Sequence, residues 1–240
     1  MNIKVSKRII KIAQYIAFDR IADIGADHGY LPIFALKSKL ASSAVAADIN
    51  ERPLLSAREN AKAAGVNGIE FRLGYGLEAL DPGEVDTIVI AGMGGRLIVE
   101  ILRNGISVAA SARQLLLSPH LDVPVVRREV HALGFSITAE DMVRDDGKYY
   151  NILDVRTSAA FEYDYSEEEY LLGRCLINTR PPVFVEFCRH MTERYDGIIE
   201  KINAAPQLGE EGMERLAESM RIRGMYSKFG ADTSLTPSCL

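Results

Sequence analysis

Apolar positions in the first 157 residues alternate between short unbroken runs and segments with a spacing of three or four. The runs predict buried strands, and the spaced segments predict helices with one apolar face. The expected strands are 20–25, 43–50, 69–74, 85–91 and 114–118, and the expected helices are 9–16, 31–40, 52–65, 97–102 and 125–133. Gly65 is the expected C-terminal stop of the third helix. Strands alternating with helices predict an α/β domain built on a parallel sheet.

Two features define the middle and the end of this expected sheet. The runs 87–91 and 114–118 are nearly all apolar, as in central strands covered by helices on both faces. Segments 135–143 and 149–156 are separated by a turn that contains Asp146 and Gly147. Because Asp-Gly is a strong turn signal, we expect an antiparallel hairpin to close the sheet.

After Thr157 the pattern becomes helical throughout. Ser166 followed by Glu169 predicts a capping box that opens a helix. Apolar residues then recur with steps of three and four, at Phe184, Phe187, Cys188, Met191, Tyr195, Ile198, Ile199 and Ile202, and again at Met213, Leu216, Ala217 and Met220. The break between Pro206 and Gly209 predicts an antiparallel helical hairpin, and the last residues are expected to be frayed. The chain therefore divides into an α/β domain, 1–157, and a helical, coiled-coil-like domain, 158–240.

The composition favours an ordinary folded protein. Of the 240 residues, 48% are hydrophobic and 25% are charged, and no run reaches the ~18 apolar residues that span a bilayer. The N-terminus predicts an amphipathic helix without a secretory signal. Three widely spaced cysteines, Cys175, Cys188 and Cys239, offer neither a metal cluster nor a disulfide framework. We expect a cytoplasmic protein without metal or membrane; the sequence specifies no oligomeric state.

The net charge of −5 argues mildly against a protein that coats nucleic acid. A local basic face is still compatible with an enzyme that binds RNA. Two clusters offer such a face: Lys4, Lys7, Arg8 and Lys11 near the start, and Arg127, Arg128, Arg144 and Lys148 later. The alternative is that both are ordinary solvated charges.

The first candidate binding loop follows the first strand and reads Asp23-Ile-Gly25-Ala-Asp27-His28-Gly29. Gly25 lets the backbone pass close to a ligand, and Gly29 lets the next helix pack nearby. The glycine spacing differs from the dinucleotide fingerprint G-x-G-x-x-G. It is closer to the loop that holds S-adenosylmethionine, with Asp27 replacing the middle glycine. The alternative is a plain turn in which Asp27 is a helix N-cap.

Asp48 ends the second strand about twenty residues after this loop. A carboxylate there can accept hydrogen bonds from both hydroxyls of a ribose. This geometry serves NAD and S-adenosylmethionine alike, so it indicates an adenosine without choosing between them. Asp48 is also a candidate cap for the helix that follows.

The third candidate loop, Ala91-Gly92-Met93-Gly94-Gly95, follows the fourth strand and exposes backbone with few side chains. It lacks the Asn-Pro-Pro-aromatic element that orients exocyclic amines in many methyltransferases. A ring nitrogen needs less, because adenine N1 has a free lone pair and loses no proton before it attacks a methyl group. Catalysis then depends on positioning and electrostatics.

With these loops in view, the chain resembles the bacterial tRNA (adenine(22)-N(1))-methyltransferase family. The matching segments are SKRI, ADIGADHGYLP, AADINERPLLSA, GYGLEAL, IAGMGGRLI and EDMVRDDGKYYNILDV, in order and spacing over most of residues 1–156. The helical domain matches more loosely, through LLG near its start. The resemblance implies a Rossmann-like fold that uses S-adenosylmethionine and a helical domain that helps to bind tRNA.

The resemblance also implies roles for individual residues. Asp27 is the expected carboxylate for turnover. The expected cofactor contacts are Asp23, Gly25, Asp27, His28, Gly29, Asp48, Ile49, Asn50, Gly74, Tyr75, Gly76, Ala91, Gly92 and Met93. One departure concerns Tyr75, which stands where the family usually has an Asp between two glycines. We expect its ring to stack on the cofactor adenine in place of the hydrogen bond that Asp would accept.

Three other functions compete with this interpretation. Another S-adenosylmethionine-dependent methyltransferase would act on a different RNA, a small molecule or a protein. A catalytically inactive binding protein would share the fold, but it would not need Asp27, Asp48 and the AGMGG loop together. An NAD oxidoreductase would need a different glycine spacing and a hydride-transfer pair such as His-Asp or Tyr-Lys.

Overall fold

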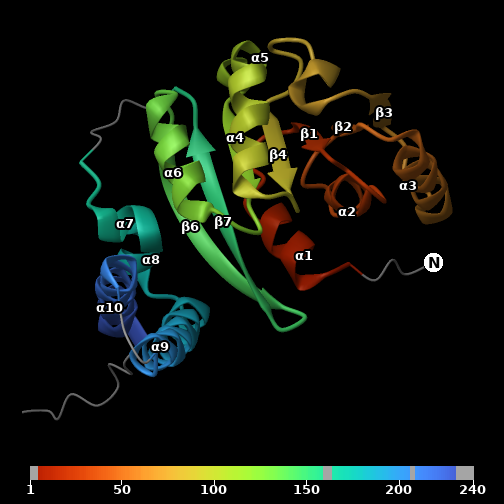
Figure 1. The fold of residues 1–240 in the computed structure, drawn as a ribbon. Helices are drawn as coiled ribbons and strands as arrows, with labels where there is room; N and C mark the ends of the chain where they lie inside the picture. The colour runs from red at the N-terminus through yellow and green to blue at the C-terminus, as the bar shows by residue number, and fades with distance from the viewer. Residues whose placement is uncertain (1–4, 159–163, 206–208, 231–240) are drawn as a thin grey trace, which may run out of the picture. The chain divides into compact units, whose positions relative to one another are not determined.

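The computed structural model describes residues 5–158, 164–205 and 209–230. The chain forms two compact units that meet in sequence between Tyr165 and Ser166. The first contains the whole sheet and the second contains only helices (Figure 1). Each unit is described separately below.

The first unit is a seven-stranded sheet with the order β3-β2-β1-β4-β5-β7-β6. The strands are β1 (Arg20–Ile24), β2 (Ser43–Asp48), β3 (Ile69–Leu73), β4 (Thr87–Ala91), β5 (Gln114–Ser118), β6 (Ser136–Asp145) and β7 (Lys148–Arg156). Strands β1 to β5 are parallel, and β7 pairs antiparallel with both β5 and β6. The predicted parallel sheet with a closing hairpin is confirmed. At the hairpin turn both Asp146 and Gly147 have positive φ, as a two-residue turn that matches the strand twist requires.

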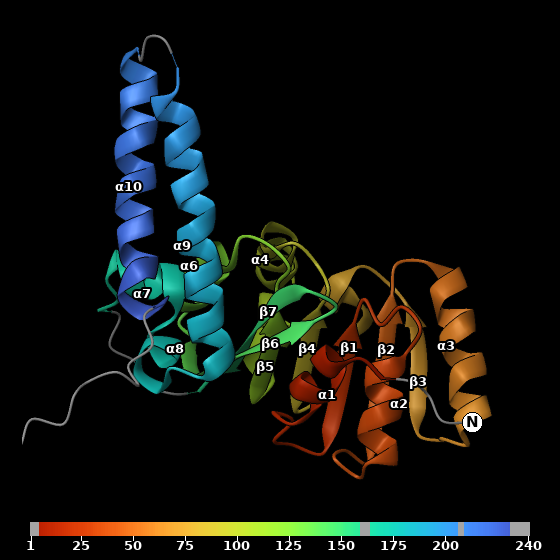
Figure 2. The ribbon, with the colours of Figure 1, turned by 90° about the horizontal axis from the view of Figure 1, so that it is seen from below.

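Helices cover the sheet on both faces, as the apolar central strands predict (Figure 2). They are α1 (Lys7–Ala13), α2 (Tyr30–Lys37), α3 (Glu51–Ala64), α4 (Gly95–Asn104), α5 (Ile106–Ser111) and α6 (Val123–Ala132), with a 3-10 turn η1 (Gly76–Ala79). Neighbouring residues of β4 point to opposite faces: Ile88 and Ile90 pack with Ile98 of α4, whereas Val89 packs with Ile12 of α1. The sheet is therefore the middle layer of three.

The sequence predicted the end of one helix correctly and the end of another too late. Gly65 caps α3 in the left-handed conformation, as predicted. The helix predicted over 31–40 ends earlier, at Lys37, and Lys39 follows with φ of 58°. The sequence patterns missed η1 and α5, which are single turns or little more, and such short helices lack a full amphipathic period.

The second unit contains α7 (Glu167–Leu172), α8 (Arg174–Thr179), α9 (Pro182–Asn203) and α10 (Glu210–Gly230). The predicted capping box is present: the Ser166 hydroxyl accepts from the Glu169 amide, and the Glu169 side chain reaches back to Ser166. Helices α9 and α10 run side by side (Figure 2). They are antiparallel, because Phe184 near the start of α9 contacts Phe229 near the end of α10. The predicted break at 206–209 and the predicted frayed end fall largely outside the described residues.

The structure changes the interpretation of one basic cluster. Arg127 of α6 is 1% exposed and donates to Glu140 of β6 at 2.6 Å. The prediction that Arg127 belongs to a basic surface that binds RNA is therefore wrong. A charge buried among three elements needs such a counter-charge, because desolvation otherwise costs several kcal/mol. Arg128 lies on α6, whereas Arg144 and Lys148 flank the turn between β6 and β7, and Lys4 lies outside the described residues.

Candidate functional site

The carboxyl ends of β1, β2 and β4 meet at one edge of the sheet. Strand β1 lies between β2 and β4, so the order of the strands reverses at β1. In open α/β sheets ligands bind outside the carboxyl ends of the strands at this point. All three predicted loops follow these strands and therefore converge on the place where the fold favours a ligand.

The loop after β1 is bent by residues in the left-handed conformation. Gly25, Asp27 and Gly29 have φ of 74°, 47° and 70°. Gly29 is the residue before α2, so Asp27 does not cap that helix, and the alternative role weighed for it is wrong. The Asp27 side chain is 68% exposed, and its carboxylate lies 3.6 Å from the ring of His28. Asp27 therefore presents its charge to whatever approaches this edge.

Asp48 ties the ends of β1 and β2 together. One carboxylate oxygen accepts from the amide of Asp27 at 3.2 Å, and the other accepts from the amide of Asn50 at 2.9 Å. The residue before α3 is Asn50, without a side-chain cap, so Asp48 does not cap α3. A carboxylate has about four acceptor positions, and two are used. Asp48 can therefore accept from two ligand hydroxyls while its own orientation is already fixed.

Asp23 is the buried acid of the site. Asp23 is the next-to-last residue of β1 and is only 6% exposed. Burial raises the pKa of this carboxyl to about 7; the nearby carboxylates of Asp48 and Asp27 also raise it, and the charge of Arg8 lowers it. Among the described residues no side chain donates a hydrogen bond to Asp23. Such a carboxylate can bind a cationic group of a ligand or accept a hydrogen bond from it.

Asp23 faces a small cavity of about 120 Å³. It is lined by Arg8, Ile9, Ile12, Asp23, Gly25, Ala26, Asp27, His28, Tyr30, Leu31 and Ala91. The lining combines the loop after β1, the end of β4 and the helix α1, which the sequence did not associate with the site. Two carboxyl groups, those of Asp23 in β1 and of Asp27 in the loop, border this one space.

The loop after β4 approaches the loop after β1. A Cβ placed on Gly25 would lie 2.1 Å from the Met93 methyl group, so a side chain there would have to displace the end of Met93 and would also be strained by the φ of 74°. The backbone of the loop is held from β5, because the His120 amide donates to the Met93 carbonyl at 2.8 Å and Gly92 donates to Ser118 at 3.2 Å. Gly92 itself has φ of 83°. Three strands thus fix this side-chain-poor surface.

Arg8 is the functional candidate that the sequence placed elsewhere, in a basic surface cluster. Its guanidinium lies 2.5 Å from the Nε2 of His120 and 5.0 Å from the centre of the Tyr150 ring. Burial, together with the charges of Arg8 and Lys148, lowers the pKa of His120. The neutral imidazole can therefore accept from Arg8. The pattern of α1 gives no signal for this role, since a single Arg on an amphipathic helix looks like any solvated charge.

The remaining predicted residues occupy the β2 and β3 end of the site. The Gly74 amide donates to the Asp48 carbonyl at 3.0 Å, and Gly76 has φ of 55°. The Tyr75 hydroxyl donates to Glu100 at 2.7 Å, which fixes where its ring lies. Ile49 is 59% exposed next to Asp48. The two ends of the site are therefore bridged by Asp48.

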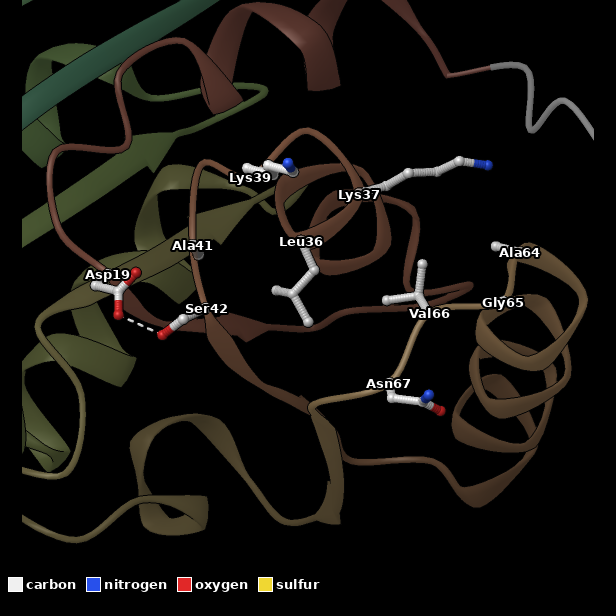
Figure 3. A pocket seen from close by; sticks show the side chains of 10 residues that line it. All are labelled: Asp19, Leu36, Lys37, Lys39, Ala41, Ser42, Ala64, Gly65, Val66 and Asn67. Atoms are coloured by element: carbon white, nitrogen blue, oxygen red, sulfur yellow. Dashed lines mark hydrogen bonds between the residues drawn. The ribbon is translucent and has the colours of Figure 1, made fainter.

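The structure has a larger hollow, of about 610 Å³, away from these loops (Figure 3). It is lined by residues before β1 and between α2 and β2, among them Asp19, whose carboxylate accepts from the Ser42 hydroxyl, and by the end of α3. These segments lie at the amino ends of the strands. No predicted site residue is among its lining, so its size does not make it the candidate site.

The site's chemistry fits an adenosine that carries a charged tail. Asp48 offers acceptors for a ribose, and the glycines leave room for close approach of a ligand. The cavity beyond offers carboxylates and a guanidinium. Within the described ranges 5–158, 164–205 and 209–230, no group of three or more His, Cys, Asp or Glu could hold a metal ion. No helix in that part of the chain is long and apolar enough to cross a membrane.

Comparison with known proteins gives three consistent results. A family model described as a methyltransferase domain matches residues 5–153. The chain is 32% identical to the tRNA (adenine(22)-N(1))-methyltransferase of Bacillus subtilis over 228 residues, covering 92% of this chain and 96% of that protein. Two crystal structures show proteins that are 30% identical in sequence to this chain. The B. subtilis m1A22 tRNA methyltransferase TrmK has a TM-score of 0.84 over 96% of this chain and 100% of that chain.

The second crystal structure is a Streptococcus pneumoniae protein described as a putative tRNA (m1A22) methyltransferase in complex with S-adenosyl-L-methionine. Its TM-score is 0.79, and the match covers 95% of this chain and 100% of that chain. The similarity in both structures includes the helical unit as well as the sheet, since it spans nearly the full length of each chain.

Proposed function

The chain belongs to the bacterial tRNA (adenine(22)-N(1))-methyltransferase family, and we propose that it methylates N1 of adenine 22 in tRNA with S-adenosylmethionine as methyl donor. The observation that carries this proposal is the convergence of the three loops at the carboxyl edge of β1, β2 and β4 in a chain that matches such enzymes over nearly its full length. The Rossmann-like fold alone would leave the substrate open.

The geometry of these loops supports the proposed cofactor residues. Asp48 accepts the ribose hydroxyls, and the backbone of Gly25 and Gly92 lets the ligand lie close to the sheet edge. We assign the Tyr75 ring to the adenine of the cofactor, and Met93, whose methyl group lies next to Gly25, is a further proposed contact. The other contacts are those expected from the family: Asp23, Asp27, His28, Gly29, Ile49, Asn50, Gly74, Gly76 and Ala91.

When bound, S-adenosylmethionine supplies an electrophilic methyl group on a sulfonium. The protein needs no general base, because adenine N1 attacks through a free lone pair. It must hold N1 in line with the methyl group and exclude water from the reacting atoms. N1 becomes cationic as the methyl arrives. The exposed carboxylate of Asp27 can stabilise this charge, which is its proposed role in turnover.

Substrate selection is assigned to the rest of the chain. N1 lies on the Watson–Crick edge of adenine, so the target base must be unpaired or turned out of its stack. The helical unit α7–α10 supplies tRNA contacts outside the sheet. Because the proposed substrate is tRNA, we place the reaction in the cytoplasm.

The proposal is tested with two transcripts of one bacterial tRNA that differ only at position 22, adenine or guanine. Methyl transfer from labelled S-adenosylmethionine is measured for both. We expect transfer to the adenine transcript alone. Equal transfer to both transcripts would assign the enzyme to another site in the RNA, and transfer to neither, with intact cofactor binding, would assign it another acceptor.

A further inference from the structure

The AGMGG loop after β4 carries no aromatic side chain, yet two aromatic rings from other elements lie next to it. His120 follows the end of β5 and Tyr150 lies near the start of β7, and the centres of their rings are 5.3 Å apart. Strands β5 and β7 are antiparallel, with Leu117 opposite Leu153. Three residues further along this pairing, His120 comes opposite Tyr150. The sheet therefore places the two rings as a pair at the carboxyl end of β5.

Neighbours hold this pair of rings against the loop. The His120 amide donates to the Met93 carbonyl at 2.8 Å, and a Cβ placed on Gly92 would lie 3.9 Å from the Nε2 of His120. The guanidinium of Arg8 contacts His120 and lies over the Tyr150 ring. His120 is exposed and Tyr150 is half-buried, so a ligand can reach both. Next to the rings, Gly92 offers backbone without a side chain.

The order of the strands indicates which ligand meets the rings. Asp48, the proposed ribose carboxylate, ends β2, and β1 separates β2 from β4. The ends of β4 and β5 are next along the edge, in the direction away from the ribose. Transfer of the methyl group requires an acceptor on the far side of that group from the sulfur. The rings of His120 and Tyr150 lie on the acceptor side of the site.

We propose that His120 and Tyr150 form the binding site for the acceptor adenine, which packs on their rings while Gly92 lets it approach the methyl group. This assignment rests on the proposed function and deepens it by naming the residues that hold the base. An adenine turned out of the RNA loses its stacking neighbours, and aromatic side chains replace part of that contact. The aromatic surface that the AGMGG loop lacks is thus supplied by β5 and β7.

The electrostatics of His120 suit this role. Burial, together with the charges of Arg8 and Lys148, lowers the pKa of His120 below its ordinary value of 6.5. The imidazole is therefore mainly neutral at pH 7 and adds no positive charge beside N1 as the methyl group arrives.

Two competing roles exist for the pair of rings. In the first they are structural and only keep Arg8 and the closing hairpin in place. In the second they belong to a surface that contacts the RNA backbone, to which Arg8 and Lys148 would contribute charge. Neither role depends on the base at position 22, whereas a binding site for the acceptor adenine does.

The test uses two tRNAs that differ only at position 22, one with adenine and one with an abasic site. Their dissociation constants are measured for the full chain, Tyr150→Leu and His120→Ala, with saturating S-adenosylhomocysteine so that no methyl group is transferred. We expect each variant to bind the adenine tRNA about 10-fold more weakly, the range of one lost base–aromatic contact. Affinity for the abasic tRNA should stay within about twofold of the unsubstituted chain.

Two further variants act as controls. Tyr150→Phe keeps the ring and should bind both tRNAs almost as the unsubstituted chain does. Tyr149→Leu removes the neighbouring tyrosine of β7, which the alternation of a strand directs to the other face of the sheet. Any loss of affinity in Tyr149→Leu should be equal for the two tRNAs.

Three outcomes would overturn the proposal. Equal weakening of both tRNAs in Tyr150→Leu and His120→Ala would make the rings structural or assign them to the RNA backbone. A selective loss in Tyr150→Leu alone would remove His120 from the site. A loss in Tyr150→Phe as large as in Tyr150→Leu would assign the effect to the hydroxyl instead of the ring.

The same two tRNAs separate this proposal from the proposed function. The unsubstituted chain is also incubated with labelled S-adenosylmethionine and the adenine tRNA. Methyl transfer without any selective loss in the variants would overturn the adenine site alone. Absence of methyl transfer would overturn the proposed function and this site with it.

Discussion

The substitution Asp27→Asn separates the chemical role of this carboxylate from its structural ones. Asn tolerates the left-handed conformation that Asp27 adopts at φ of 47°, so the loop should keep its path. The side chain is 68% exposed and does not cap α2, so little folding energy depends on its charge. The melting temperature should change by no more than about 2 °C.

The rate of methyl transfer should respond far more strongly. One electrostatic contact to a charge that develops in the transition state contributes about 10²–10³-fold in rate. Because the Asp27 carboxylate is largely exposed before tRNA covers it, we expect the lower end, a fall of about 10²-fold in turnover. Single-turnover transfer to saturating tRNA is the direct assay, and S-adenosylhomocysteine affinity should change little.

Asp146→Asn is the matched control. Asp146 has the same φ of 47° and is exposed, but it lies in the β6–β7 turn and lines no part of the cavity. Its substitution should leave both rate and melting temperature unchanged. Near-normal turnover in Asp27→Asn would refute the electrostatic role, and an equal loss in Asp146→Asn would show that the assay reports on loop conformation.

Four further predictions follow from the same geometry. Asp48→Asn should weaken S-adenosylmethionine by about 10-fold or more, measured by calorimetry, because ribose hydroxyls lose a charged acceptor; unchanged affinity would remove Asp48 from the site. Glu140→Gln should lower the free energy of unfolding by ~3–5 kcal/mol in denaturant titration, because it removes the carboxylate charge that pairs with the buried Arg127 guanidinium; a loss under ~1 kcal/mol would contradict this role of the pair. In the ligand-free protein, burial raises the pKa of Asp23 from its ordinary value of 3.8 to about 7, so between pH 3.8 and 7 the folded state binds more protons than the unfolded state. Stability should therefore fall as pH rises through that window, and Asp23→Asn should flatten the fall; the same slope in both proteins would contradict this prediction. A chain that ends at Tyr165 should still bind S-adenosylhomocysteine and lose most affinity for tRNA; full tRNA methylation by this truncated chain would assign recognition to the sheet unit.

Much of the fold was predictable because the sheet is built from local signals that agree. All seven strands were expected within a few residues, since central strands such as β5 are unbroken apolar runs and the Asp146-Gly147 turn specifies its hairpin. The site loops were predictable for a related reason: the glycines and acids follow strands directly, and parallel strands bring their carboxyl ends together.

The missed features depend on tertiary contacts that no local pattern encodes. Arg127 looked like a surface charge because its partner Glu140 lies on another element. Arg8 looked the same, yet the packing of α1 on the sheet carries it over Gly92 and beside the cavity. The sequence predicted that Asp48 binds a ribose. The structure adds that Asp48 joins two loops, because its carboxylate accepts hydrogen bonds from the amides of Asp27 and Asn50.

The central claim is that the methyl group is transferred to N1 of adenine. The most direct test is to incubate the full chain with S-adenosylmethionine and unmodified bacterial tRNA, digest the product and identify the methylated nucleoside by chromatography and mass spectrometry. The site described here predicts 1-methyladenosine as the product. Methylation of the exocyclic amine, giving N6-methyladenosine, or of another base would contradict it.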